Sequence, residues 1–474
     1  MTTPRDRAHI LVERHGWNTT SFQTLEPHFR YWFSTDGQGM VAYYDLPTGW
    51  VAAGAPVAPE ESLGRIAAAF IEDGRRAGKA VSFFGLHDRG VELLGDRVEA
   101  LKVGEQPWWD PQHWESRHTV RREVASQIRR AGRKGVRVAA VDPARMKDQA
   151  STQRRAAESV MRAWSRSRPM SAMGFLVYLD PFTFSESRRY FLAEQDGRPV
   201  GFLALVPIAA RNGWFLEDLL RIPDAPNGTA EMLVDAAMRA IAAEGARYAT
   251  LGMVPLKGFE SSPVELPRWG RTLFRFSSRY LNAFYGFEGL AAFKSKFHPE
   301  GWENIYLAGA PRVTPITVLS TLLAFARARP VRFILATLAR MIRHGFEDMK
   351  PALWRKLSLL LAATLLIWIV ILSTADAGRW FGAEWTRMGW VIFDLAMLGL
   401  FILIGSGHPR HPARIQTAAL VALGATLTDL LLTIVQVAHL HSSDLTIGIM
   451  AIGGPAVASI FFLGLAVASG SWRR

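Results

Sequence analysis

The feature that most limits how this chain can fold is a series of apolar stretches in its last quarter. They lie near Leu357–Ala375, Met388–Ser406, Ile415–His439 and Leu445–Ser469. Each comes close to or exceeds the roughly 20 residues that an α-helix needs to cross a bilayer. We therefore predict an all-α transmembrane region of four helices over residues 356–474.

The charged residues between these stretches predict the orientation of the membrane region. The cations that flank the stretches on one side are Arg355, Lys356, Arg410, Arg414, Arg473 and Arg474. Positively charged loops usually remain in the cytoplasm, so both termini are expected there, and the protein is expected to be a multi-pass inner-membrane protein. The N-terminus lacks the apolar segment of a cleavable signal peptide. Asp394 and Asp429 fall inside the second and third stretches, where a role in transport and hydrogen bonding between helices both remain open.

A basic segment precedes the apolar stretches. Residues 312–346 contain arginines and no acidic residue, interleaved with leucine, isoleucine and phenylalanine, and Pro330 divides them. This composition predicts basic amphipathic juxtamembrane helices over residues 311–355 that lie on an anionic leaflet. A soluble helix packed on the preceding domain is the competing interpretation.

Residues 1–310 mix strand-like and helical patterns, which indicates α/β or α+β modules over residues 1–150 and 151–310. The strand-like runs include Met40–Tyr44, Trp50–Ala53, Ala80–Phe84 and Tyr248–Met253, and the helical patterns include Leu63–Ala77 and Arg154–Arg166. Asp196-Gly197 predicts a hairpin between Tyr190–Glu194 and Val200–Ile208.

Net charge restricts the choice of partners. The chain carries 55 Lys and Arg against 42 Asp and Glu, a formal charge of +13. This balance favours association with polyanions, either nucleic acid or an anionic membrane surface. The absence of cysteine excludes disulfides, thiolate chemistry and cysteine zinc sites. No Gly-x-Ser-x-Gly, Walker A or His-Glu-x-x-His motif occurs, so neither a cofactor nor a metal is expected.

The strongest local cluster of cations lies in residues 117–135. A candidate surface for tracking tRNA phosphates consists of Arg122, Arg129, Arg130, Arg133 and Lys134. Arg122, Arg129 and Arg133 fall near one face at helical spacing. An ordinary solvated helix face explains the same pattern.

The stretch from Glu217 to Glu231 reads as a strand end, a loop rich in proline and glycine, and a helix start near Ala230. Thr229 or Asn227 is expected to cap that helix. This arrangement places Asp218, Arg221 and Glu231 at the rim of a sheet, beside a helix N-terminus that favours anions. An ordinary loop with a local Asp218–Arg221 pair is the alternative.

Several motifs resemble the phosphatidylglycerol lysyltransferase (aminoacyl-phosphatidylglycerol synthase) family. The resemblance rests on Asp218-x-x-Arg221 with Ala225-Pro-Asn-Gly228 and Glu231, on Ser21-Phe-Gln-Thr-Leu25, on Leu251-Gly-Met-Val-Pro-Leu256, and on Phe287-Glu-Gly-Leu290 with Phe293-Lys-Ser-Lys-Phe297. It implies tandem acyltransferase-like (GNAT) domains over residues 1–150 and 151–310. It also implies transfer of an amino acid from an aminoacyl-tRNA to the hydroxyl of an anionic membrane phospholipid.

The resemblance implies a set of site residues. The expected catalytic residues are Asp218, Arg221 and Glu231, and the expected substrate-binding residues are Asn227, Gly228, Lys257, Arg279, Lys294 and Lys296. Asp218 would act as a base or hold the α-ammonium group, and Arg221 would bind a phosphate. Lys294-x-Lys296 on a strand would direct both amines to one face; a solvated lysine pair is the alternative.

Two other functions remain open. An acyl-CoA-dependent N-acyltransferase would use the same fold, but Arg129-Arg-Ala-Gly132-Arg-Lys134 places lysine where its pyrophosphate loop needs a small residue. A membrane-anchored RNA- or lipid-binding protein would use the fold as a scaffold. Family members commonly carry a large membrane module before the synthase, whereas here the apolar stretches follow it, so product flipping is not implied.

Overall fold

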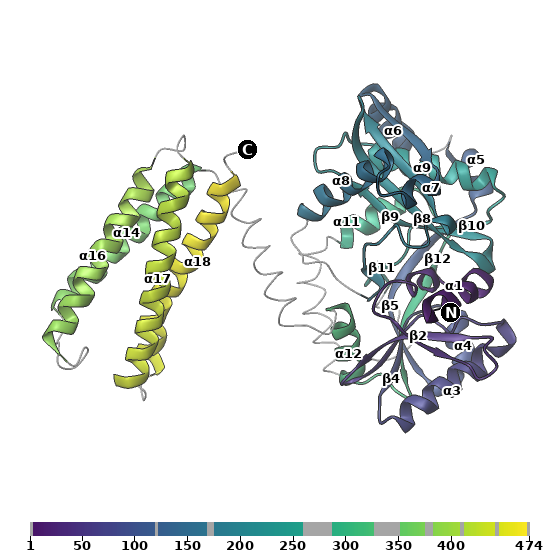
Figure 1. Ribbon diagram of the computed structural model, residues 1–474, viewed down its shortest axis with the longest axis horizontal. Helices are drawn as coiled ribbons and strands as arrows, with labels where there is room; N and C mark the ends of the chain where they lie inside the picture. Colours follow the sequence, from purple (N-terminus) through teal and green to yellow (C-terminus); the bar gives the residue numbers. More distant parts are fainter. Residues whose placement is uncertain are drawn as a thin grey trace. The chain divides into compact units, whose positions relative to one another are not determined.

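The computed structural model describes residues 3–118, 122–167, 175–258, 287–326, 351–374, 383–407, 412–440 and 445–471. The chain divides into two compact units, Met1–Leu335 and Ala336–Arg474 (Figure 1). Arg279 and the basic residues from Arg327 to Arg343 lie outside the described residues, so the predictions made for them remain predictions.

The first unit is built on one mixed sheet whose strand order is β1-β2-β3-β4-β12-β5-β10-β9-β8-β7-β6, with β11 paired to β5. Its strands are β1 (Arg30–Phe33), β2 (Met40–Leu46), β3 (Gly49–Ala53), β4 (Val81–Leu86), β5 (Glu99–Trp109), β6 (Val136–Val141), β7 (Arg189–Gln195), β8 (Arg198–Ile208), β9 (Gly213–Arg221), β10 (Tyr248–Thr250), β11 (Val254–Pro255) and β12 (Gly301–Ala310). The pairs β3–β4 and β9–β10 are parallel, and the other pairs are antiparallel.

Helices cover this sheet along its length (Figure 1). They are α1 (Pro4–His15), α2 (Thr19–Gln23), α3 (Leu63–Arg76), α4 (Asp88–Leu94), α5 (Trp114–His118), α6 (Arg122–Arg133), α7 (Pro143–Lys147), α8 (Thr152–Arg166), α9 (Thr229–Ala243), α11 (Phe287–Ser295) and α12 (Pro315–Phe325). The helices predicted at 63–77 and 154–166 are confirmed within two residues by α3 and α8.

The hairpin between β7 and β8 shows how local sequence sets the register. Asp196 and Gly197 have φ values of 50° and 81°, the pair of positive angles that a tight type I′ turn requires. Residues Val200–Val206 of β8 are almost completely buried, because β7 and β9 flank the strand and helices α8 and α9 pack on it. The predicted hairpin is therefore confirmed.

The two halves of the sheet do not follow the boundary expected at residue 150. Strand β6 lies at the far edge of the half formed by β7–β10, although it precedes that boundary. Strand β12 lies between β4 and β5, although it was assigned to the second module. The long strand β5 explains the continuity, because it pairs with β12 along most of its length and with β10 at Trp108 and Trp109.

The second unit consists of long helices: α14 (Pro351–Thr374), α16 (Glu384–Ser406), α17 (Pro412–Leu440) and α18 (Leu445–Ser471). Three stretches are long and apolar enough to cross a membrane, namely Leu353–Val370, Glu384–Ser406 and Ala413–Ile434. Within the described side chains, α18 shows a shorter apolar stretch, Gly453–Ala466. The fourth span therefore remains a prediction. Asp394 and Asp429 are both buried inside this unit.

Helix α12 corrects part of the juxtamembrane prediction. Its sequence from Pro315 to Phe325 contains no charged residue, and the helix packs on β2, β3 and β4 of the first unit. The competing interpretation, a helix packed on the preceding domain, therefore holds for these eleven residues.

Candidate functional site

Asp218 of β9 is half-buried and lies in a cluster of charged side chains. The pairing of β8 and β9 shifts register between Ala204–Asp218 and Leu205–Leu216, so Glu217 is the extra residue of a β-bulge. The carboxylate of Glu217 accepts a hydrogen bond of 2.8 Å from the guanidinium of Arg188, and both side chains are buried. Arg188 also donates to the backbone carbonyls of Asp180 and Thr183. The local Asp218–Arg221 pair considered above is not formed: Asp218 interacts electrostatically with Glu217 and Arg188.

Glu26 completes this group, which we call the carboxylate cluster: Glu26, Asp180, Glu217 and Asp218 around Arg188. Glu26 is only 6% exposed, and its Oε2 has no hydrogen-bond partner among the described residues. Burial raises the pKa of Glu26 well above its usual range, and repulsion from Glu217 and Asp218 raises it further. Burial and then Glu217 raise the pKa of Asp218 in the same way. Carboxylates thus outnumber the cation that faces them among the described side chains.

The motif Ser21-Phe-Gln-Thr-Leu25, which we call the N-terminal motif, packs against the carboxylate cluster. Phe22 of helix α2 lies under the guanidinium of Arg188, with 4.9 Å between the ring centre and the guanidinium carbon. Gln23 donates a hydrogen bond of 2.8 Å to the carbonyl of Leu176, in the segment that leads to Asp180. Sequence reasoning assigned no role to Glu26, Asp180, Arg188 or Glu217. Two signals were available, because Glu26 directly follows the N-terminal motif and Glu217 directly precedes Asp218.

A cluster with this surplus of carboxylates suits two kinds of chemistry. It can bind a cation such as an ammonium group, because a buried carboxylate is stabilised by an opposite charge. It can also hold a proton, because burial raises the pKa of Glu26 and of Asp218 well above the usual carboxyl range.

The other residues of the Asp218 motif lie in different surroundings. Arg221 is exposed at the end of β9, and its side chain has no hydrogen bond or ion pair with the described residues. Glu231 is buried in the first turn of α9 and pairs with Lys296. The structure therefore places Asp218, Arg221 and Glu231 on neighbouring elements without direct contact among the three.

The loop before α9 departs from the capping expected of it. The residue before the helix is Gly228, with a φ of 99°, and no side chain caps the helix. A Cβ at Gly228 would lie 2.1 Å from the carbonyl oxygen of Gln127, so a glycine is needed where α6 crosses this loop. Thr229 instead donates its hydroxyl hydrogen to the carbonyl of Pro226 at 2.7 Å, and Asn227 is exposed.

The two lysines of Phe293-Lys-Ser-Lys-Phe297 do not share a face. Helix α11 ends at Ser295, so Lys294 and Lys296 lie on the last helical turn and beyond it, and not on a strand. Lys294 is 5% exposed and donates to the carbonyls of Gly252 and Met253 at 2.8 and 3.0 Å. Burial lowers the pKa of Lys294 to about 7. Lys257 pairs with Glu105 and lies over the ring of Trp302 at 3.5 Å.

The basic helix α6 presents its cations to solvent. Arg129, Arg130, Arg133 and Lys134 are exposed, whereas Val124 and Ala131 of the same helix are buried against the core. Arg122 lies at the start of α6, but its side chain is outside the described set. The predicted helix with a cationic face is thus confirmed as a structural feature, and its partner remains a prediction.

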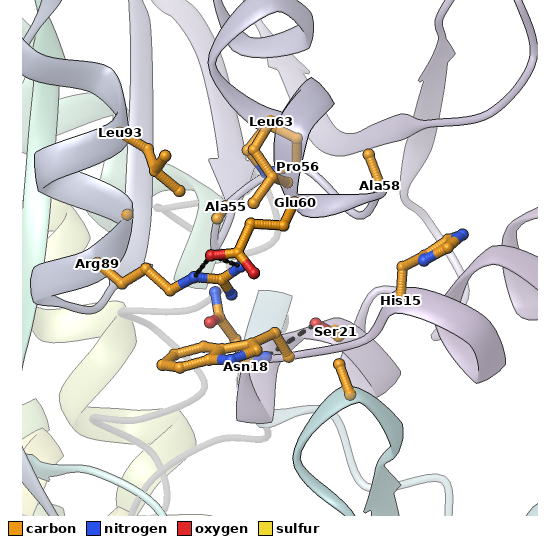
Figure 2. A pocket seen from close by; sticks show the side chains of 13 residues that line it. His15, Asn18, Ser21, Ala55, Pro56, Ala58, Glu60, Leu63, Arg89 and Leu93 are labelled. Carbon is orange, nitrogen blue, oxygen red and sulfur yellow. Dashed lines mark hydrogen bonds and ion pairs between the residues drawn. The ribbon is translucent and has the colours of Figure 1, made fainter.

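A pocket of about 160 Å³ lies beside the N-terminal motif (Figure 2). Asn18 and Ser21 line it, together with His15 and the ion pair of Arg89 with Glu60 at 2.9 Å. The guanidinium of Arg89 lies 4.8 Å from the ring centre of Trp17. The segment of α2 therefore contributes to both the pocket and the carboxylate cluster.

Comparison with known proteins identifies the family of the chain. Residues 9–309 match the family model described as "Phosphatidylglycerol lysyltransferase, C-terminal". The phosphatidylglycerol lysyltransferase of Bacillus subtilis is 24% identical over 310 residues, which cover 64% of this chain and 35% of that protein. An uncharacterized protein of Corynebacterium glutamicum is 22% identical over 328 residues, 65% of this chain and 40% of that protein. The chain thus matches well under half the length of these curated relatives.

Two solved structures share the fold of the first unit. The C-terminal domain of a putative lysylphosphatidylglycerol synthetase from Agrobacterium fabrum aligns with a TM-score of 0.57 and 23% identity, covering 67% of this chain and 96% of that one. The structure of L-PGS from Bacillus licheniformis aligns with a TM-score of 0.58 and 19% identity, covering 69% and 97%. Because the family model spans most of the first unit and includes all the described residues of the carboxylate cluster, this chain belongs to the phosphatidylglycerol lysyltransferase C-terminal family.

Proposed function

We propose that this protein transfers an amino acid from an aminoacyl-tRNA to the hydroxyl of an anionic membrane phospholipid such as phosphatidylglycerol. Family membership supports lipid aminoacylation as the reaction class. The name of the Bacillus subtilis relative, phosphatidylglycerol lysyltransferase, supports a lysyl donor and this acceptor. We further propose that the first unit is a tandem acyltransferase-like fold that works at the cytoplasmic leaflet, where tRNA is found.

The carboxylate cluster is the observation that carries this proposal. An aminoacyl group brings an α-ammonium, and a lysyl group brings a second ammonium on its side chain. The unpartnered Oε2 of Glu26 and the raised pKa values of Glu26 and Asp218 describe a site whose negative charge is not compensated within the described residues. An ammonium bound there would stabilise the ionised carboxylates, and the carboxylates would hold the amino acid in place.

The proposed transfer needs little covalent chemistry from the protein, because the donor ester is already activated. The lipid hydroxyl oxygen bonds to the ester carbonyl carbon, and the bond from that carbon to the tRNA ribose oxygen breaks. The hydroxyl proton passes to the departing ribose oxygen. Asp218 is suited to carry this proton because burial raises its pKa well above that of an ordinary aspartate, so its carboxylate accepts a proton more readily.

The remaining site residues receive supporting roles in this proposal. Arg221 is exposed at the strand end and available to bind a phosphate of lipid or tRNA. The exposed cations Arg129, Arg130 and Arg133 on α6, with Lys134 directly after it, would follow the tRNA backbone. Lys257 and Lys296 already pair with Glu105 and Glu231, so they would orient the site and not bind a substrate phosphate directly.

The geometry of α6 weighs against the acyl-CoA-dependent alternative. A pyrophosphate is usually bound by free N–H groups at the beginning of a helix. The stretch Arg129-Arg-Ala-Gly132-Arg lies in the last turns of α6, where the unpaired backbone groups are carbonyl oxygens. This end of a helix favours cations over phosphates.

The proposal is tested by mass spectrometry of lipids from cells with and without the protein. We expect an aminoacylated phospholipid that disappears in the deletion strain. In isolated membranes, RNase should abolish the transfer and removal of coenzyme A should not. Activity that survives RNase but requires an acyl-CoA would overturn the proposed donor.

Charge reversal on α6 tests the donor surface separately. Arg129→Glu, Arg130→Glu and Arg133→Glu together should raise the tRNA concentration needed for half-maximal transfer and leave the lipid requirement unchanged. The salt dependence of tRNA binding should weaken by about one unit of slope for each phosphate that the variant no longer neutralises. Arg65→Glu, Arg75→Glu and Arg76→Glu remove exposed cations of a different helix and provide the matched control.

A further inference from the structure

An exposed apolar surface lies on helix α12 and the short 3₁₀ helix η4 (Phe175–Val177), which contact each other. Among the described residues of the first unit, five large hydrophobic side chains are exposed: Ile10, Val177, Ile316, Leu319 and Leu322. All except Ile10 belong to α12 or η4. We call these four residues the α12–η4 patch. Clustered exposed apolar side chains mark an interaction surface more often than scattered ones do.

Helix α12 is apolar on its outward face as well as on its inward face. A helix in water normally turns its apolar stripe toward the core and its polar residues toward solvent. On the inward side, Val318, Leu323 and Phe325 are partly buried against the core, and the fully buried side chains are polar or small: Thr317, Ser320, Thr321 and Ala324. The exposed side chains Ile316, Leu319 and Leu322 follow at intervals of three and are about half exposed, at 52%, 48% and 53%. The outward face is therefore suited to an apolar environment.

The orientation of α12 is fixed by specific interactions. Thr314 forms a capping box at the start of the helix, and the Ser320 hydroxyl donates to the Thr48 hydroxyl at 2.8 Å. At the other end, the ring of Phe325 packs edge-on against Phe84 and Phe175, with centroids 5.1 and 5.2 Å apart. Because both ends are held, the helix cannot turn Leu319 and Leu322 inward without breaking these interactions.

The course of the chain indicates what covers this patch. Helix α12 ends at Phe325, and the next described element is α14, which begins at Pro351 and includes the first apolar span. The sequence between them carries Arg327, Arg329, Arg332, Arg340, Arg343 and Lys350 against Glu347 and Asp348. A basic segment next to a membrane span is attracted to an anionic leaflet. The sequence that follows α12 is therefore itself suited to an anionic bilayer surface.

We propose that the α12–η4 patch inserts into the interfacial region of the anionic bilayer that this chain itself crosses. Amphipathic surfaces of this kind bury their apolar side chains about 5–10 Å into the boundary between headgroups and acyl chains. The docking does not depend on the proposed reaction.

The patch has a structural link to the carboxylate cluster. Val177 is followed three residues later by Asp180, and the carbonyl of Leu176 accepts the hydrogen bond from Gln23, whose helix leads to Glu26. Docking would thus set the height of the cluster above the leaflet. This second consequence, presentation of the cluster to a lipid headgroup, rests on the proposed function.

Site-directed spin labelling of the full chain tests the docking. The sequence has no cysteine, so Leu319→Cys and Val177→Cys each provide one labelling position, and Ile10→Cys provides an exposed apolar control outside the patch. In nanodiscs that contain phosphatidylglycerol, labels at Leu319 and Val177 should collide more with oxygen and less with an aqueous nickel complex than the label at Ile10. Equal access of the nickel complex at all three positions would overturn the proposal. Protection from both reagents would also overturn it, because protein and not lipid would then cover the patch.

A functional variant separates docking from catalysis. Leu319→Glu should slow transfer to phosphatidylglycerol in the bilayer about tenfold, which corresponds to about 1.4 kcal/mol. Transfer to a water-soluble glycerophosphoglycerol should be unchanged, and Ile10→Glu should alter neither rate. Equal loss with both acceptors would contradict the docking role. If the parent protein transfers no amino acid at all, the proposed function fails while the labelling result still decides the docking.

Discussion

The carboxylate cluster around Asp218 and the pair formed by Glu231 and Lys296 differ in how their charges are balanced. Glu231 and Lys296 match one acid with one base, and both side chains are largely buried. The cluster sets Glu26, Asp180, Glu217 and Asp218 against Arg188, and one oxygen each of Glu26 (Oε2) and Glu217 (Oε1) has no hydrogen-bond partner among the described residues. In a buried pair of one acid and one base, the two charges stabilise each other. A buried cluster with more carboxylates than cations is most stable when it binds a proton or a cation.

Residues of a single sequence motif therefore lie in two different electrostatic environments. Asp218 and Glu231 belong to the same stretch of strand, loop and helix, yet one lies in the cluster and the other holds α9 to the segment after α11. We therefore expect changes at the cluster to affect transfer more than folding, and changes at the pair to affect folding more than transfer.

The largest effect is expected for Asp218→Asn, which keeps the shape of the side chain and removes its charge. Loss of a general base typically lowers the rate by about 10²–10⁴-fold. The midpoint of thermal unfolding should stay the same or rise, because the variant removes repulsion from Glu217. Lipid aminoacylation and thermal unfolding should be measured on the same preparation. Near-normal transfer would remove Asp218 from the catalytic assignment, and a large fall in the midpoint would give it a structural role.

Breaking the balanced pair should mainly affect stability. Lys296→Met leaves Glu231 as a buried carboxylate without its partner, which costs about 3 kcal/mol of unfolding free energy at the low end of measured cases. Adding Glu231→Gln should restore most of that stability, and chemical denaturation of single and double variants measures it. A double variant no more stable than Lys296→Met would contradict the pairing. If the double variant is stable but inactive, Glu231 contributes to the reaction as well.

The pH dependence of stability should reveal the cluster directly. Glu26 and Asp218 have pKa values raised by burial, so the unfolded chain releases their protons at a lower pH than the folded one. The contribution of these two carboxyl groups to the free energy of unfolding is therefore fully present below the ordinary carboxyl range near pH 4. It decreases as the pH rises through their raised pKa values. Unfolding midpoints between about pH 4 and 8 should fall less steeply in Glu26→Gln than in the parent. Parallel curves would show that Glu26 is not a source of the effect.

The smallest structural effect is expected for Arg221→Lys. Arg221 is exposed and has no described ion pair, so the unfolding free energy should change by less than about 0.5 kcal/mol. If Arg221 binds a phosphate through its planar fork, the Michaelis constant for one substrate should rise even though the charge is kept. Unchanged kinetics for both tRNA and lipid would remove Arg221 from the site.

Local sequence patterns predicted much of the secondary structure correctly. The Asp196-Gly197 turn, the helices at 63–77 and 154–166 and the cationic helix at α6 depend on turn chemistry and periodicity within a few residues. Predictions that depended on how the surrounding chain packs were wrong. Lys294 and Lys296 were assigned to a strand because a short apolar run fits a strand or a buried helix equally well.

The sequence by itself determined that the chain has a mixed α+β region followed by long apolar helices, because periodicity and span length are local properties. Tertiary structure decided which charges meet. It brought Glu26, which follows the Ser21–Leu25 motif, and Arg188, which directly precedes β7, to Asp218 on β9. It also placed β12 between β4 and β5. It turned an apolar face of α12 outward as well. These outcomes depend on strand pairing and burial between residues far apart in the sequence, where the cost of an unpaired charge is set by surroundings that no local pattern encodes.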